Sequence, residues 1–127
     1  MSEKNKELVQ QVNDAFSNNK PEIFMDLCSD DIHWTIAGDQ SFNGKDAIRK
    51  FMASMGDTEP PKFSVDRIIA DGDSVACYGE MSMKGKSEKD ETYTFCDIYR
   101  FNDGKIVDLQ SIMAKHKTED ESNAKAV

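Results

Sequence analysis

Residues 93–107 read Tyr-Thr-Phe-Cys-Asp-Ile-Tyr-Arg-Phe-Asn-Asp-Gly-Lys-Ile-Val, a pattern typical of a β-hairpin. Its first nine residues alternate with a period of two, as in a β-strand, and Asn102-Asp103-Gly104 is a strong hairpin signal. A carboxyl group among aromatic rings is costly to ionise unless something pairs with it. The odd positions share one face of the strand, which carries four aromatic rings and one carboxyl group, from Tyr93, Phe95, Asp97, Tyr99 and Phe101.

The same period of two extends over the whole second half of the chain, after Pro60-Pro61. Asp71-Gly72-Asp73 is a second hairpin signal. The pattern predicts four consecutive antiparallel strands, over residues 63–70, 74–84, 91–101 and 105–113.

The first part of the chain has a helical period instead. Apolar residues recur on one helical face at Leu8, Val9, Val12, Ala15 and Phe16. We expect a short second helix from Pro21 to about Cys28, a turn over 29–31, a strand over 32–36, a loop over 38–44 and a third helix over about 45–55. The order ααβαββββ predicts an α+β fold with helices packed on one face of a sheet.

Composition excludes several classes of function. The chain has 127 residues and a net charge of −8, so it would repel nucleic acid. No apolar run is long enough to span a membrane and no signal peptide is evident, so we expect a cytoplasmic protein. The three cysteines lack metal-binding spacing and are expected to be free thiols. We expect neither a metal site nor a cofactor.

Three segments resemble the NTF2-like superfamily, in particular its SnoaL-like and ketosteroid-isomerase-like branch. They are residues 27–34, 38–51 and 97–107, within a resemblance that covers about residues 6–114. It implies a cone of three N-terminal helices on a strongly curved, mostly antiparallel sheet around an apolar pocket. The chain length separately predicts a single domain, over 1–114, and the polar composition of 115–127 predicts a tail. Family members include isomerases, dehydratases, polyketide cyclases and epoxide hydrolases, so the fold alone does not give the function.

The resemblance also allows a comparison of catalytic positions. In ketosteroid isomerases a tyrosine, a basic aspartate and a protonated aspartic acid act together, and the matching positions here are Val12, Ile36 and Asp97. One of the three groups is retained, so the inherited isomerase mechanism is not expected. An epoxide-hydrolase site needs two carboxylates bridged by an arginine. Arg67 could supply this arginine from a neighbouring strand, and the sequence leaves open whether its side chain reaches Asp97.

Asp97 has two interpretations. It is either a structural carboxyl bonded to a neighbouring group, or an acid, base or hydrogen-bond donor that acts on a ligand. Tyr99 lies two residues along the same face and is the second candidate catalytic residue. It could equally be a core residue.

The remaining inward positions predict a soft apolar chamber with few polar groups. Such a chamber favours a small, mostly apolar, neutral ligand, although ordinary core packing explains the same residues. The predicted lining is Val12, Phe16, Phe24, Trp34, Ile36, Phe51, Met52, Met55, Cys77, Met81, Phe95, Leu109, Ser111 and Met113.

The outer face of the predicted sheet carries Cys96, Ile98 and Ile112 beside polar residues. An apolar patch with a polar rim predicts a homodimer through this face. Three functions therefore remain open: a pocket protein that binds a small molecule, an isomerase, cyclase or dehydratase that uses Asp97, and an interaction module that uses the outer sheet face.

Overall fold

The computed structural model describes residues 2–54, 60–84 and 90–116. In order along the chain, the elements are α1 (Ser2–Ser17), α2 (Pro21–Leu27), β1 (Cys28–Ile36), β2 (Gln40–Asn43), α3 (Lys45–Ser54), β3 (Lys62–Asp71), β4 (Ser74–Lys84), β5 (Asp90–Asn102) and β6 (Lys105–Lys115). The predicted α+β order of the longer elements is confirmed.

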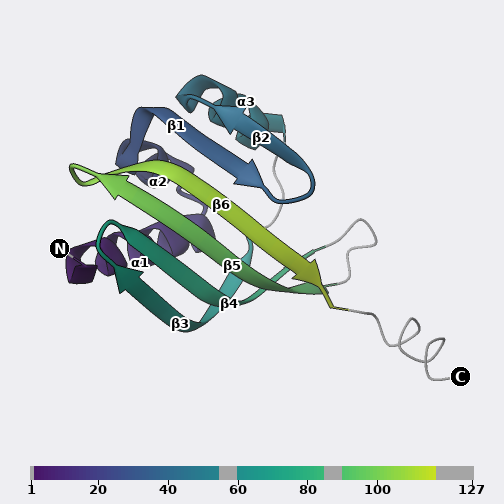
Figure 1. Cartoon of the computed structure of the whole chain (residues 1–127). Coiled ribbons are helices and arrows are strands. Elements are labelled where there is room, and N and C mark those ends of the chain that lie inside the picture. Colours follow the sequence, from purple (N-terminus) through teal and green to yellow (C-terminus); the bar gives the residue numbers. More distant parts are fainter. Residues whose placement is uncertain (1, 55–59, 85–89, 117–127) are drawn as a thin grey trace, which may run out of the picture.

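The strands form one curved sheet in the order β2-β1-β6-β5-β4-β3 (Figure 1). Neighbouring strands are antiparallel except β1 and β6, which run parallel. The β5–β6 hairpin turns at Asp103 and Gly104, whose φ angles are 51° and 76°. Both residues thus have the positive φ that a two-residue hairpin turn requires, as the sequence predicted.

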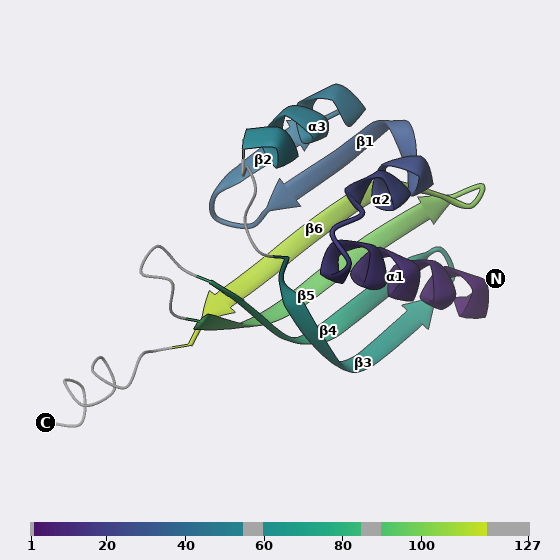
Figure 2. The same ribbon diagram turned by 180° about the vertical axis from the view of Figure 1, so that it is seen from behind.

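The helices all lie on one face of the sheet (Figure 2). Helix α1 crosses β3 and β4, while α3 lies over β1 and β2. We call this covered side the inner face and the opposite side the outer face. The core forms between helices and inner face, and its fully enclosed members include Val9, Val12, Phe24, Ile32, Ile48, Val75, Tyr99 and Ile106. Burial of each large apolar side chain stabilises the fold by roughly 1.5–3 kcal/mol.

Two predictions about the first part of the chain were wrong. Residues 29–31, expected to form a turn, belong to β1, which begins at Cys28 because Cys28 pairs with Ile106 of β6. The expected loop over 38–44 contains β2, which pairs with the end of β1. In both cases pairing with a distant or neighbouring strand outweighs the local turn residues. The predicted third helix is confirmed over Lys45–Ser54, and Met55 lies outside the described residues.

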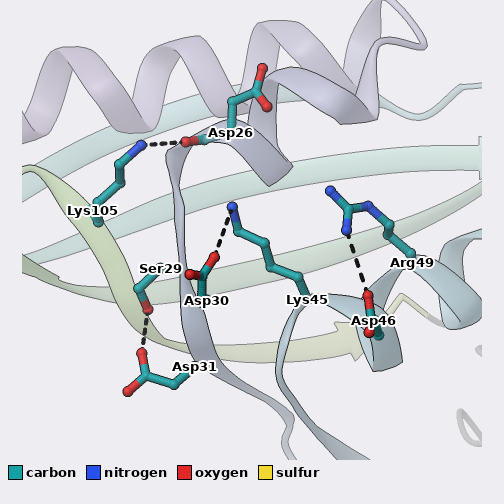
Figure 3. A network of polar contacts seen from close by, with 8 residues as sticks. All are labelled: Asp26, Ser29, Asp30, Asp31, Lys45, Asp46, Arg49 and Lys105. Carbon is teal, nitrogen blue, oxygen red and sulfur yellow. Dashed lines mark hydrogen bonds and ion pairs between the residues drawn. The ribbon is translucent and has the colours of Figure 1, made fainter.

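The start of β1 is fixed by contacts from two other elements (Figure 3). Lys105 of β6 donates a hydrogen bond of 2.7 Å from Nζ to the backbone oxygen of Asp26 at the end of α2. Lys45, the first residue of α3, lies 3.8 Å from a carboxylate oxygen of Asp30 in β1. The two contacts thus connect α2, β1, α3 and β6 near the start of β1, and the exposed ion pair itself contributes little energy.

Candidate functional site

The polar residues of the inner face meet in one row across the sheet. Cys77 of β4 lies opposite Asp97 of β5, Asp97 lies opposite Ser111 of β6, and Ser111 pairs with Ile36 of β1. Side chains directly opposite one another in adjacent strands are close neighbours on the same face. Asp97 is therefore flanked by a thiol on one side and a hydroxyl on the other.

This row marks the boundary between the closed and the accessible parts of the inner face. Along β6, Ile106 and Leu109 are 0% and 3% exposed, Ser111 is 7% exposed, and Met113 is 43% exposed. Along β1, Ile32 is buried whereas Ile36 is half-buried. The helices thus cover one end of the inner face, and the far end of β1 and β6 keeps accessible apolar side chains.

Asp97 sits at this boundary with an altered acidity. Burial raises its pKa from the ordinary 3.8 to about 6, and the hydrogen bond with Ser111 opposes this rise. The residue nevertheless remains only partly buried. A carboxyl group that is deep enough to be desolvated but keeps accessible surface can exchange protons and contact a ligand.

Trp34 is held by aromatic side chains from three elements. Its ring lies 5.9 Å from Phe24 of α2, 6.0 Å from Phe42 of β2 and 5.7 Å from Phe51 of α3. Its indole Nε1 donates a hydrogen bond of 2.9 Å to Ser111 Oγ. The aromatic cluster therefore fixes a donor beside the polar row. Sequence reasoning missed Phe42 because it placed this residue in a loop.

Asn13 of α1 is a second residue that sequence reasoning missed. It is buried, and its Nδ2 donates a hydrogen bond of 3.4 Å to Cys77 Sγ. The helical period contained the signal, because position 13 follows Val9 by four residues and so shares its buried face. Burial raises the pKa of the Cys77 thiol, so this thiol stays neutral and is no nucleophile at neutral pH.

Tyr99 lies in the closed part of the inner face. Its ring stacks on Phe101 at 6.3 Å, and it is 2% exposed. Burial and the neighbouring Asp97 raise the pKa of its hydroxyl well above the ordinary value, so Tyr99 remains neutral.

The predicted lining residues divide into two groups. Seven are buried: Val12, Phe24, Cys77, Met81, Phe95, Leu109 and Ser111. Six keep accessible surface: Phe16, Trp34, Ile36, Phe51, Met52 and Met113. Met55 lies outside the described residues.

Arg67 does not complete an epoxide-hydrolase arrangement. A β-bulge between Val65 and Arg67 places Arg67 opposite Tyr78, an exposed residue of the outer face. Its side chain is exposed and forms an ion pair of 3.5 Å with Asp66. Asp108 pairs with His33 at 3.5 Å. In the described part of the chain, these charged groups are thus engaged away from Asp97.

Two further observations concern ligands and membranes. Over residues 2–54, 60–84 and 90–116, no three histidine, cysteine or acidic side chains converge in a way that could hold a metal ion. Within the same ranges, every helix is too short or too polar to cross a membrane.

A curved sheet with three helices on its inner face is the fold of the small NTF2-like cone proteins. The family model of the SnoaL-like domain matches residues 9–109, and the chain therefore belongs to the SnoaL-like domain family. No protein of curated function matches the chain in sequence.

Solved structures share this fold at low sequence identity. An NTF2-like protein of unknown function from Cytophaga hutchinsonii is 23% identical, with a TM-score of 0.72 and coverage of 90% of this chain and 99% of that one. An LEH-like epoxide hydrolase from M. tuberculosis is 16% identical, with a TM-score of 0.79 and coverage of 89% and 84%. TerC, co-crystallised with polyporic acid, is 18% identical, with a TM-score of 0.76 and coverage of 87% and 92%.

Proposed function

We propose that this protein binds a small, mostly apolar, neutral molecule at the accessible end of the inner face, with Asp97 as the polar group that contacts it. The single observation that carries the proposal is the position of Asp97 at the boundary between buried and accessible inner-face residues. An apolar site with one or two polar groups takes ligands of this kind. A neighbour of similar fold, TerC, was co-crystallised with a small molecule, polyporic acid, which supports the proposal.

Two adjacent residues provide a matched test of the binding face. Met113 and Ile112 are 43% and 45% exposed and lie on opposite faces of β6. Nile red is a suitable probe because it is neutral, apolar and carries one ring carbonyl. We expect saturable binding, which Met113→Lys weakens about tenfold or more and Ile112→Lys leaves unchanged. Equal loss in both variants, or no saturable binding to the unmodified chain, would refute the proposal.

A second candidate function is proton transfer, as in an isomerase, cyclase or dehydratase. The observation that favours it is the pKa of about 6 at Asp97, which lets both protonation states exist near neutral pH. Asp97 would then remove or donate a proton at a carbon next to a ligand carbonyl.

This second candidate has its own assay. Deuterium incorporation from D₂O into a panel of cyclic ketones and enones would be followed by NMR. If Asp97 is the base, exchange rises with pH through a midpoint near 6 and levels off above it, and Asp97→Asn lowers it by about a hundredfold or more. Nile red binding with no Asp97-dependent exchange would leave the protein as a binder alone.

We also propose that two copies associate through the outer face. Four large apolar side chains are exposed there, on four adjacent strands: Ile69, Tyr78, Ile98 and Ile112. The register places Ile98 opposite Ala76, which lies opposite Ile69, so the patch is continuous across the sheet. Burying such a patch against its own copy removes apolar area from water.

Light scattering tests the association directly. The expected mass at micromolar concentration is twice the 14.3 kDa of the chain. Ile98→Asp should give the monomer mass, whereas Met113→Lys on the inner face should not change it. A monomer mass for the unmodified protein would remove the proposal.

A further inference from the structure

The hydrogen bond between Trp34 and Ser111 has a fixed direction. An indole N–H is a donor only, so Ser111 Oγ accepts at 2.9 Å from Trp34 Nε1. A hydroxyl has a single hydrogen, and this contact leaves that hydrogen free to be donated elsewhere. Ser111 is 7% exposed, so solvent competes weakly for it.

Asp97 is the acceptor that the register places opposite Ser111. The Ser111 hydroxyl lies next to the Asp97 carboxyl on the inner face, and this contact lowers the pKa of Asp97, which means that it favours the ionised carboxylate. A partner that favours the ionised form is a donor. The donation therefore runs in one direction, from Trp34 through Ser111 to Asp97.

The Trp34 indole, which is the first donor in this series of contacts, is held rigidly. The Trp34 ring has neighbours at 5.7–6.0 Å in α2, β2 and α3. Phe42 and Phe51 in turn contact each other at 4.5 Å. The indole cannot rotate away from Ser111 without displacing three aromatic side chains, so the direction of the hydrogen bonds is built into the packing.

We propose that Trp34 and Ser111 are positioning residues that keep one oxygen of Asp97 as a permanent hydrogen-bond acceptor, so that a proton on Asp97 occupies the other oxygen. Neutral Asp97 then offers its O–H to the carbonyl or other acceptor of a ligand, and ionised Asp97 offers the same oxygen as a base. Only one part of this inference, the contact between Asp97 and a ligand, rests on the proposed function. The hydrogen bond from Trp34 to Ser111 and the position of Ser111 beside Asp97 exist without a ligand.

Other titratable groups near Asp97 do not interfere with its titration. Cys77 on β4 and Tyr99 on β5 both have raised pKa values and stay neutral while Asp97 ionises. Asn13 on α1 and Ser111 on β6 do not titrate. His33 is next to Trp34 in sequence and lies 3.5 Å from a carboxylate oxygen of Asp108, so a variant at this position serves as a control.

The chain offers a direct readout because Trp34 is its single tryptophan. In ¹H–¹⁵N NMR of the ligand-free protein, we expect the indole Nε1–H resonance to move with pH at a midpoint near 6. The movement should persist in His33→Gln and vanish in Asp97→Asn. In Ser111→Ala it should vanish as well, while the pKa of Asp97, followed by its carboxyl ¹³C signal, rises by about one unit.

A conservative variant and a packing control complete the test. Ser111→Thr keeps the hydroxyl and should retain the indole titration. Trp34→Phe removes the donor and should raise the pKa of Asp97, whereas Phe42→Leu loosens the same cluster but keeps the indole donor and should raise that pKa less. The inference is overturned if the indole titrates unchanged in Ser111→Ala, or if Phe42→Leu shifts Asp97 as much as Trp34→Phe.

This outcome is separable from the proposed function. If the indole titrates as expected but Nile red does not bind, the proposed ligand site is refuted and the positioning role is supported. If Nile red binding depends on Met113 but the indole does not titrate, the positioning role is refuted and the proposed ligand site is supported.

Discussion

Replacing Asp97 by asparagine should make the stability of the protein less dependent on pH. Asparagine has nearly the same shape and lets Ser111 keep its hydrogen bond to a side-chain oxygen, but it cannot ionise. The replacement therefore isolates the free energy of placing a charged carboxylate in the inner face, with little change in packing.

The structure sets the size of the effect. The pKa of Asp97 is about 6 in the folded chain against an ordinary 3.8. The difference of about two units corresponds to about 3 kcal/mol. Because the folded pKa is raised, this group's stabilising contribution is fully present below about pH 4 and is lost as pH rises through about 6.

The assay is urea unfolding of the wild-type protein and Asp97→Asn at about pH 4 and about pH 8. Other carboxylates titrate in both proteins, so the difference between the two unfolding free energies reports on Asp97 alone. Between the two pH values, we expect the unfolding free energy of the variant to rise by up to about 3 kcal/mol relative to that of the wild type. Most of this change should occur below about pH 6.5. A difference that stays constant with pH would refute the reasoning, because Asp97 would then ionise equally easily in the folded and unfolded chains.

Three further predictions concern the core and the thiols. Gly79→Ala should destabilise the fold by about 1–3 kcal/mol or more in urea unfolding, because the added Cβ would meet the backbone oxygen of Ser64 and lie 2.9 Å from Val65 Cα; a neutral effect would mean that β3 shifts freely. Leu109→Ala should cost about 3 kcal/mol by the same measurement, because it leaves a cavity in the closed part of the inner face, and a loss under about 1 kcal/mol would contradict the close packing described. In the folded Ile98→Asp variant, whose outer face should stay uncovered, a thiol reagent should label only Cys96, since the other two cysteines are buried; labelling of three thiols without urea would contradict this.

Local sequence patterns predicted the strands of the second half and the faces of their side chains. The alternation over residues 93–101 placed Phe95, Tyr99 and Phe101 on one face, and all three are buried on the inner face. The turn residues at Asp103 and Gly104 set the hairpin. These features depend on neighbouring residues alone, so the period of the sequence is sufficient to predict them.

The features that the sequence did not predict depend on pairing between distant segments. The true start of β1 at Cys28 follows from its partner in β6. The hydrogen bond between Trp34 and Ser111 joins residues 77 positions apart. The alternation of side chains predicted that both point inward, but only the register of the three strands brings Trp34 to Ser111 and Ser111 to Asp97. The sequence could thus predict which residues belong to the candidate site, but not which of them contact one another.

The parallel pairing of β1 with β6 has a consequence for how the chain folds during synthesis. In the described sheet, β1 and β2 are joined to the remaining strands only through β6. The segment that carries Trp34 therefore cannot complete its pairing until the last strand has been made, and closing so long a loop is slow. Until β6 pairs with β1, the complete sheet does not cover the aromatic rings around Trp34, and these rings can associate with other chains. The fluorescence of this single tryptophan should consequently report the final step of folding.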